Sequence, residues 1–587
     1  MKISKLISAI FSKWFFALLG IVILSGLLLY VRMPGDLYEK LLDFVSNLLQ
    51  QKYGSGGNKV KIDTGFHKLG LLVMALGVLL FTYFSFWKWF ISSASAYTQS
   101  PEINKGLSLD KKDWITISGL LLVALLLRVF PMTQSLWQDE IGVYNTFIKD
   151  GFLSTIFPKS SMGSQPLMQL LVGVFVKFAG TSEIILRLPI LMFALAGIAF
   201  IYYFTLQLSA NRLAAFIAAF FLTIHSYHIY YSFQMRGYVL LVFMCMLSCY
   251  ILIKLIQTPS SKIAFWYTVV NVCFVYTHLY SVYLLIAQHL VVIGFHLYAT
   301  RIAKNSTFTF SGPFLAIYFH AFIASMLGIL LLYLPQLPVI FMNILDTANS
   351  TKSLFDYFTQ VLDALHFMLA YSELKVLSSI LILLFIIGLW GLVKKGNTLM
   401  LVIGMAIWLF IITAFVPSGP GFFPRYLICE IPLLLFLFSL VIAECWQSSK
   451  AFLKVVAASL FVGFCAINIS GYTLSYQTIQ DYKGAVNYVQ NKPSTLPKLV
   501  AANSLGKTEI KFYDPSIIAL NQVSELDSLM KLPIDLYVIT TYESFAGKSL
   551  FINDKPTQQR IESEFSREKV FVGEFPVTVW HYEKHKG

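Results

Sequence analysis

The 587 residues are 57% hydrophobic and only 13% charged, with a net charge of +14 at pH 7 and a mean hydropathy of +0.70. Because an ordinary soluble domain has about 25% charged residues, this composition excludes a soluble globular protein and indicates an integral membrane protein. Residues 474–587 contain 13 basic and 13 acidic side chains, so the whole net charge lies in the preceding membrane part. Basic cytoplasmic loops and contact with anionic lipid account for such a charge, and nothing in it indicates nucleic acid.

Thirteen segments are apolar over the roughly 20 residues that a membrane-spanning helix needs. They are expected near residues 14–31, 69–92, 113–130, 184–206, 213–231, 238–256, 263–280, 282–299, 314–340, 376–393, 398–416, 426–446 and 452–470. The first is too long for a secretory signal and lacks a small-residue cleavage site after it, so we expect a retained anchor. Lysine and arginine in alternate short loops place the amino terminus in the cytoplasm and the carboxyl terminus on the far side. The loop at 32–68 departs from this pattern, since it is assigned outside and yet is basic.

Hydropathy divides the chain into three parts. A two-helix membrane extension occupies residues 1–112, an eleven-helix membrane body 113–473, and a polar tail 474–587. Within the tail, DYKGAVNYVQ has helical spacing, whereas KLVAAN, DLYVITTY, KVFVGEF and VTVWHY have the composition of short strands. The sequence therefore predicts a polytopic helical membrane protein with a small α/β domain on its outer surface.

The loop at 131–183 is long for a connection between helices, which is typical of a functional or structured segment. The topology places it on the outer side. DEIGVYNTFIKDGF puts Ile141, Tyr144, Ile148 and Phe152 at helical spacing, and QPLMQLLVGVFVKF is a second amphipathic segment that is too short to span. Both predict helices lying along the membrane surface.

Two adjacent carboxylates, Asp139 and Glu140, begin the first of these segments. Consecutive side chains on a helix point about 100° apart, so the two acids cannot share one proton and must do different jobs. A carboxylate at a helix amino terminus is also stabilised by a few tenths of a kcal/mol. A purely structural interpretation of the pair therefore stays open.

Four arginines are expected on the same outer side, where the positive-inside tendency does not place them. They are Arg128, Arg187, Arg236 and Arg425. An arginine near the membrane core is usually paired or faces a cavity, and its planar guanidinium suits phosphate. The alternatives are a phosphate site, snorkelling to the interface, or structural pairing with an acid such as Asp139 or Glu183.

Aromatic and histidine side chains gather at the same level. Those that could line a sugar or acceptor site are Trp137, Tyr144, Tyr231, His278, Tyr280 and Tyr426. Most such residues form an interfacial belt, and sequence does not separate the two roles. His225, His228 and His278 could join the acids in a metal site, but their spacing matches no strong ligand signature. The six cysteines lie within predicted spans and imply no disulfides.

Known nucleotide-binding and hydrolase signatures are missing from the sequence: it has no phosphate-cradling Gly-rich loop, no HExxH and no GxSxG. Five segments do occur in a recognisable order, from RVFPMTQSLWQDE through RLPILMFALAGIAFIYYF, YTHLYSVYLLIAQ and FFPRYLICEIPLLLFLFSLVI to QDYKGAVNYVQ. In this order and spacing, over about residues 113–490, the chain resembles the GT-C membrane glycosyltransferases of family 39 type. That group is related to protein O-mannosyltransferases and to the lipid A aminoarabinose transferase.

The resemblance implies transfer of a sugar from a polyprenyl-phosphate carrier to an acceptor outside the cytoplasm, with inversion at the anomeric carbon. It implies that Asp139 is the general base and that Glu140, in the same catalytic motif, is a structural or acceptor-binding partner. Arg236 and Arg425 would bind the donor phosphate, and Arg128 and Arg187 would either join them or orient the acidic loop. No cofactor and no metal are implied.

The expected partners are the lipid-linked sugar, the bilayer, and a protein, lipid A or other glycan as acceptor. The expected location is the cytoplasmic membrane, with the active site and carboxyl terminus on its outer side. Two alternatives stay open. One is a GT-C-like glycan ligase or polymerase that depends on a metal, and the other is a lipid-linked sugar transporter or flippase without transfer chemistry.

Overall fold

The computed structural model describes residues 107–156, 163–298, 312–333, 365–392, 402–407, 424–502, 506–541 and 555–582, with a few single positions between them. The predicted spans near 14–31 and 69–92 lie outside these ranges. So do nearly all of the expected extension and most of the span predicted at 398–416.

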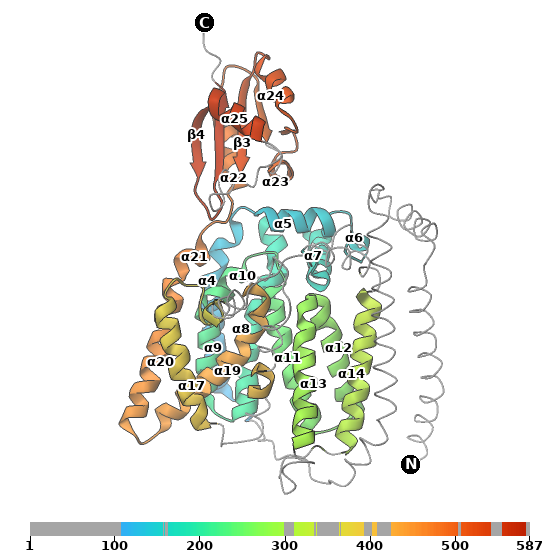
Figure 1. Ribbon diagram of the computed structural model, residues 1–587, viewed down its shortest axis with the longest axis vertical. Coiled ribbons are helices and arrows are strands. Elements are labelled where there is room, and N and C mark those ends of the chain that lie inside the picture. The colour runs from blue at the N-terminus through green and yellow to red at the C-terminus, as the bar shows by residue number, and fades with distance from the viewer. Residues whose placement is uncertain are drawn as a thin grey trace, which may run out of the picture.

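A bundle of apolar helices makes up the larger part of the described chain (Figure 1). Its helices are α4 (Lys111–Val129), α8 (Glu183–Ser209), α9 (Arg212–Ile224), α10 (Ser226–Ser232), α11 (Tyr238–Gln257), α12 (Ser261–Thr277), α13 (Val282–Leu297), α14 (Gly312–Tyr333), α17 (Lys375–Leu392), α19 (Ile431–Gln447) and α20 (Ala451–Ser470). Within the described ranges, seven helices are long and apolar enough to cross a membrane, or eight if one bent pair counts as a single span. The chain is therefore an integral membrane protein, as predicted, while the total of thirteen spans stays a prediction.

One predicted span is broken. The helix expected at 213–231 divides into α9 and α10, which meet at an angle of 57°. His225, between them, has an extended backbone with ψ of 112°, and its side chain accepts a hydrogen bond from the N–H of His228 at the start of α10. The prediction of one continuous helix was wrong because both halves are apolar, so hydropathy does not register the break.

Short helices lie across one end of the bundle (Figure 1). They are α5 (Gln138–Val143), the π-helical turn η2 (Tyr144–Ile148), α6 (Phe152–Ile156) and α7 (Pro166–Ala179). The two predicted surface helices are thus present, but the first is divided into three pieces. Gly151, with φ of +93°, lets the chain turn between η2 and α6, in a backbone region that favours glycine.

A small sheet domain, residues 482–582, stands on the same end of the bundle (Figure 1). Its strands β1 (Lys498–Ala502), β2 (Ile518–Ala519), β3 (Asp535–Thr541), β4 (Ser566–Phe571) and β5 (Val577–Tyr582) are ordered β2-β1-β3-β5-β4. Its helices are α22 (Tyr482–Asn491), α23 (Lys507–Tyr513), α24 (Val523–Met530) and α25 (Lys555–Glu564).

Pairing within this sheet is mixed. Strand β1 pairs in parallel with β2 and β3, and β5 pairs antiparallel with β3 and β4. The α/β character and four of the strands were predicted from the sequence. The two residues of β2 were missed, since so short a strand leaves no alternating pattern.

Direct contacts join the sheet domain, and the segment just before it, to the surface layer. The backbone N–H of Leu136 donates to the Tyr513 hydroxyl at 2.7 Å, and that of Gln138 donates to Oε1 of Gln480 at 2.9 Å. Tyr144 packs edge-to-face on Phe512 with ring centroids 5.5 Å apart. The start of α5 is therefore held from above by the sheet domain.

Glu509 in α23 predicts a pH dependence of stability. Its side chain is buried, its Oε2 has no hydrogen-bond partner among the described residues, and burial raises its pKa from 4.5 to about 7. Between these pKa values the folded protein retains a proton that the unfolded chain has lost. The contribution of Glu509 to stability should be fully present below pH 4.5 and should be lost as the pH rises toward and through 7.

Glu509→Gln should remove this loss and raise the thermal unfolding midpoint at pH 8 by several degrees, without a comparable gain at pH 4.5. Differential scanning fluorimetry of the full chain in detergent would measure both midpoints. Exposed Glu562 provides the control, Glu562→Gln. If both variants have the same pH profile, burial of Glu509 does not control the stability.

Candidate active site

The candidate site is built on a buried ion pair between Glu140 and Arg187. Nε and Nη2 of Arg187 donate to the two carboxylate oxygens of Glu140 at 3.0 and 2.6 Å, and both side chains are almost fully buried. The backbone N–H groups of Trp137 and Met235 donate to the same carboxylate at 3.3 and 2.6 Å. Glu140 therefore joins three segments, namely α5, α8 and the turn before α11.

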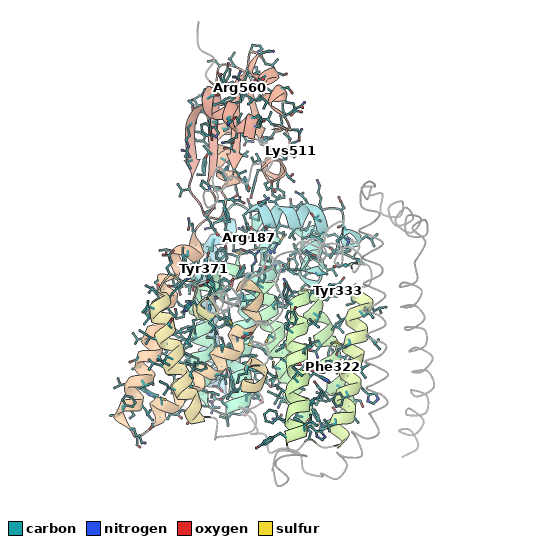
Figure 2. The ribbon with its side chains drawn as sticks, in the orientation of Figure 1. Arg187, Phe322, Tyr333, Tyr371, Lys511 and Arg560 are labelled. Atoms are coloured by element: carbon teal, nitrogen blue, oxygen red, sulfur yellow. The ribbon has the colours of Figure 1, made fainter. Side chains whose placement is uncertain are left out.

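The remaining Arg187 donors also contact protein. They reach the carbonyl oxygens of Pro131, Met132, Gln134 and Ser135 at 2.8 to 3.4 Å. Figure 2 shows Arg187 between the bundle and the sheet domain, at the level of α5. With its donors used in this way, Arg187 holds the start of the acidic loop and has no N–H left for a donor phosphate. The orienting role that the sequence left open fits these contacts.

Asp139 faces a different direction from its neighbour, as the 100° step of a helix predicts. Its side chain is 37% exposed, and its Oδ2 lies 3.6 Å from Nη1 of the buried Arg236. Glu140 produces this proximity, because it accepts from Met235, the residue before Arg236. One carboxylate thus fixes the loop, and the other is presented to the open side next to a cation.

Arg236 lies at the edge of an aromatic cluster. Its Nη2 donates to the hydroxyl of Tyr238 at 3.4 Å, and its guanidinium lies 5.7 Å from the centroid of that ring. The Tyr238 ring packs on Tyr231 with centroids 4.4 Å apart. Gly163 passes close by, since a Cβ there would lie 3.4 Å from Nη1 of Arg236. The cation is thereby enclosed by rings and backbone, with Asp139 on its open side.

Arg425 belongs to the same neighbourhood. It lies in the 3-10 helix η6 (Pro424–Glu430) that leads into α19, and it interacts electrostatically with Arg236 and Tyr231. Two cations that belong to distant parts of the sequence therefore lie close enough to interact, and one of them, Arg236, is beside Asp139. Because like charges so placed repel each other, an anion between them would be stabilised.

Arg128 has a different position, inside the break between α9 and α10. It is fully buried, and it donates to the carbonyl oxygens of Leu222 and Thr223 at 3.3 and 3.0 Å. It also donates to Ser232 and contacts Nδ1 of His228, at 3.1 and 3.0 Å. The bend leaves carbonyls at the end of α9 without helical partners, and Arg128 supplies hydrogen bonds to them. The structure thus gives Arg128 a structural role in place of the suggested phosphate contact.

The six predicted sugar- or acceptor-binding residues do not all gather at the site. Trp137 is two residues before Asp139, and its buried indole N–H has no partner among the described residues. Tyr231 is part of the cluster on Tyr238, and the ring of His278 lies 6.1 Å from that of Tyr238. Tyr280 packs against His278 with ring centroids 5.5 Å apart. In this series of rings it follows Tyr238, which contacts Arg236, and His278.

Tyr144 and Tyr426 have other outcomes. The Tyr144 ring packs on Phe512 of the sheet domain, which makes it a docking contact. The side chain of Tyr426 lies outside the described residues. The prediction of a sugar-binding role therefore stays open for Trp137, Tyr231, His278 and Tyr280, and loses support for Tyr144.

Sequence reasoning missed a carboxylate that the sheet domain brings to the cluster. Glu574, in the turn between β4 and β5, accepts a hydrogen bond from the Tyr230 hydroxyl at 3.3 Å. Burial raises the pKa of Glu574, and the Tyr230 hydrogen bond and Arg425 act against this rise. KVFVGEF was predicted as one strand, but β4 ends at Phe571. The glycine in this segment was the signal for a turn that brings Glu574 to the site.

Within the described ranges, no three His, Cys, Asp or Glu side chains gather as ligands for a metal ion. His225 and His228 flank the break, where Nε2 of His225 faces the carbonyl oxygen of Met368 at 2.9 Å and Nδ1 of His228 contacts Arg128. These histidines therefore belong to the packing of the helix break.

No family model and no curated protein sequence matches the chain, but solved structures share its fold. The crystal structure of ArnT from Cupriavidus metallidurans bound to undecaprenyl phosphate has a TM-score of 0.51 and 12% identity. The match covers 81% of this chain and 99% of that one. ArnT is a GT-C glycosyltransferase, and the likeness confirms the GT-C fold predicted from the sequence.

Two other structures have lower scores. For the archaeal oligosaccharyltransferase AglB from Archaeoglobus fulgidus, in complex with an inhibitory peptide and a dolichol-phosphate, the TM-score is 0.43 at 11% identity, covering 81% of this chain and 75% of that one. For the arabinosyltransferase EmbB from Mycobacterium smegmatis, the TM-score is 0.36 at 12% identity. That match covers 76% of this chain and 47% of the EmbB chain.

The Glu140–Arg187 pair predicts a large and asymmetric effect on stability. Arg187→Met leaves a buried carboxylate without its cation and should lower the free energy of unfolding by about 3–5 kcal/mol. The double variant Arg187→Met/Glu140→Leu should recover most of this loss, because it removes both charges. Denaturant unfolding in detergent micelles would give the double-mutant cycle.

The control for this cycle is the more exposed pair of Lys483 and Glu183, whose atoms are 2.9 Å apart. Lys483→Met should cost less than about 1 kcal/mol. Equal losses for Lys483→Met and Arg187→Met would show that the buried pair is not the principal connection between α5 and α8.

Proposed function

We propose that the protein is an inverting glycosyltransferase that moves a sugar from a polyprenyl-phosphate carrier to an acceptor at the outer face of the cytoplasmic membrane. The observation that carries this proposal is the position of Asp139. It is a partly exposed carboxylate 3.6 Å from the buried cation of Arg236, at one end of an apolar bundle that has the fold of ArnT. A base and a phosphate-binding cation are thereby side by side.

The arginine contacts support this division of roles. Among the described residues, the side chain of Arg236 makes a single hydrogen bond, at 3.4 Å to Tyr238, whereas Arg187 and Arg128 use their donors on protein acceptors. The Arg236 guanidinium therefore retains N–H groups for a phosphate, which it can bind in a bidentate manner. Arg425 adds a second positive charge to the same region. That ArnT was solved with undecaprenyl phosphate supports a lipid phosphate as the anion.

In the proposed reaction, Asp139 takes the proton of an acceptor hydroxyl as its oxygen attacks the anomeric carbon of the donor sugar. The new glycosidic bond forms while the bond from that carbon to the phosphate oxygen breaks. The electron pair leaves with the polyprenyl phosphate, and one direct displacement inverts the configuration. Arg236 and Arg425 stabilise the charge that develops on the phosphate, so no second acid is needed to protonate the leaving group.

The long distance between Asp139 and Arg236 fits this scheme. At 3.6 Å the two groups form an ion pair but no hydrogen bond. An arriving phosphate would compete with Asp139 for the guanidinium. Once Arg236 binds the phosphate, the carboxylate is freed to accept a proton from the acceptor.

Asp139→Asn tests the base. The variant should lose sugar transfer by about 10² to 10⁴ while it still binds the lipid phosphate, since the asparagine retains the shape but not the basicity. The measurement is transfer of labelled sugar from polyprenyl-phosphate sugars to membrane acceptors, with undecaprenyl phosphate binding followed in parallel. Asp150→Asn, which removes an exposed acid of the same loop, is the matched control and should retain activity.

Unchanged transfer by Asp139→Asn would exclude it as the base. If labelled sugar is moved across the membrane by an unrelated route without a glycosylated product, the protein is a transporter. Loss of transfer with a chelator would identify a metal-dependent reaction instead.

Arg236→Gln tests the phosphate site. Binding of undecaprenyl phosphate should weaken by about tenfold or more, because a hydrogen bond to a charged group contributes roughly 1.5–3 kcal/mol. The affinity of Arg236→Lys should lie between those of Arg236→Gln and the original protein, since lysine retains the charge but not the planar fork. Displacement of a labelled polyprenyl phosphate measures the affinities, and Arg567→Gln in exposed β4 is the control. Equal affinities for all variants would contradict the assignment.

A further inference from the structure

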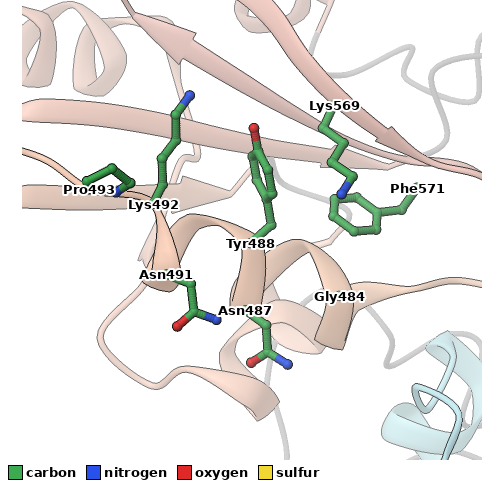
Figure 3. A pocket seen from close by; sticks show the side chains of 8 residues that line it. All are labelled: Gly484, Asn487, Tyr488, Asn491, Lys492, Pro493, Lys569 and Phe571. Atoms are coloured by element: carbon green, nitrogen blue, oxygen red, sulfur yellow. The ribbon is translucent and has the colours of Figure 1, made fainter.

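A groove of about 470 Å³ lies on the sheet domain between α22 and β4. Its lining consists of Gly484, Asn487, Tyr488, Asn491, Lys492, Pro493, Lys569 and Phe571. Figure 3 shows Tyr488 and Lys492 rising from α22 toward the sheet, where Lys569 and Phe571 come from β4 to meet them. Aromatic faces and ammonium groups thus share one surface, while the amides of Asn487 and Asn491 point away from the sheet. Rings pack on the C–H faces of sugars, and amides donate to and accept from hydroxyls.

Fixed contacts hold the Tyr488 ring in position. Its hydroxyl donates to Oε2 of Glu568 at 3.0 Å, and Lys492 forms an ion pair with the same carboxylate. The ring of Phe571 meets Tyr488 nearly at a right angle, with centroids 6.1 Å apart. Because Glu568 balances the charge of Lys492, these contacts give a rigid aromatic wall without a net charge.

Lys569 makes the groove positive. Its side chain is exposed, and its Nζ lies 4.8 Å from the ring centroid of Tyr488 and 5.0 Å from that of Phe571. Within the described ranges no carboxylate lies within ion-pair distance of it. An ammonium group beside two rings, with its charge unbalanced, suits a ligand that combines a sugar face with an acidic substituent.

Strand β4 connects this groove to the candidate active site. Lys569 and Phe571 are two residues apart and face the same side of the strand. The chain then enters the turn with Glu574, which contacts Tyr230 of the aromatic cluster. Glu574 is three positions after Phe571, so the Cα atoms of these two residues are at most about 10 Å apart.

The turn is held firmly in this place. The backbone N–H groups of Glu574 and Phe575 donate to the carbonyl oxygens of Thr478 and Ile479 at 3.0 and 2.9 Å. A Cβ on Gly573 would lie 2.6 and 2.7 Å from the same two oxygens, so only a glycine fits this close approach. The path from the groove to the site is therefore fixed by the backbone.

We infer that this groove binds the acceptor, and that the acceptor is a glycan with carboxylate, phosphate or sulfate groups. This inference rests on the proposed transferase function. One sugar unit would lie against Tyr488 and Phe571 with its acidic group on Lys569. The glycan would then follow β4 to Glu574 and bring a hydroxyl to Asp139.

Binding to the full chain in nanodiscs tests the groove directly. The probes are tetragalacturonic acid, a heparin tetrasaccharide, neutral maltotetraose and tripolyphosphate, each measured by calorimetry at low and at high salt. The acidic sugars should bind more tightly than both maltotetraose and tripolyphosphate. Added salt should weaken the binding of the acidic sugars. Lys569→Gln should weaken the binding of the acidic sugars about tenfold and should leave the binding of maltotetraose unchanged. Asn487→Ala should weaken the binding of the sugars but not the binding of tripolyphosphate.

Lys531→Gln is the matched control, because it removes an exposed lysine of the same domain outside the groove. Three results would overturn the inference: no binding of either acidic sugar, equal binding of tripolyphosphate and the acidic sugars, or equal losses for Lys569→Gln and Lys531→Gln. Tripolyphosphate that binds as tightly as the sugars would identify a general anion patch.

Transfer assays separate this inference from the proposed function. With labelled donor and membrane acceptors, Lys569→Gln should raise the acceptor KM about tenfold with kcat retained, whereas Asp139→Asn should abolish kcat. If Asp139→Asn is inactive and Lys569→Gln has an unchanged KM, the groove inference fails alone. If Asp139→Asn is fully active, the proposed function fails whatever the groove binds.

Discussion

The buried carboxylate of Glu140 is the constraint on which the geometry of the site depends. It accepts two hydrogen bonds from Arg187 and two from backbone N–H groups, one of which belongs to Met235. These bonds fix α5 against α8 and bring the turn before α11 to the same point. Because Asp139 precedes Glu140 and Arg236 follows Met235, the proposed base and cation are positioned by their neighbours in the chain.

The four arginines that the sequence placed together have divided roles. Arg187 and Arg128 use their donors on carbonyl oxygens and on Glu140, Ser232 or His228, and each fixes an irregular part of the backbone. Arg236 and Arg425 remain close enough to interact electrostatically. Burial of a cation is costly unless hydrogen bonds or charges compensate for it, and the first two obtain this compensation from the protein itself. Arg236 forms an ion pair with Asp139 and, in the proposed reaction, gains further compensation from the phosphate.

The sheet domain contributes to the site as well as resting on it. Tyr513 accepts a hydrogen bond from Leu136 at the start of the acidic segment, and Tyr230 donates to Glu574 in the turn after β4. The first contact is at the start of α5, and the second is at the aromatic cluster. A domain fixed at two points can present a groove at a defined distance from the base, which a flexibly tethered domain cannot do.

Sequence alone determined the membrane character, the order of the apolar helices, the surface helices, four strands of the tail and the different directions in which Asp139 and Glu140 point. These follow from hydropathy, from periodicity and from the 100° step of a helix, which are local properties. Only the tertiary structure decided that Arg187 and Arg128 use their donors on protein acceptors, where α9 breaks and which residue of the sheet domain reaches Tyr230. Each of these depends on contacts between distant segments, such as Arg128 with the end of α9. Apolar periodicity does not encode such contacts.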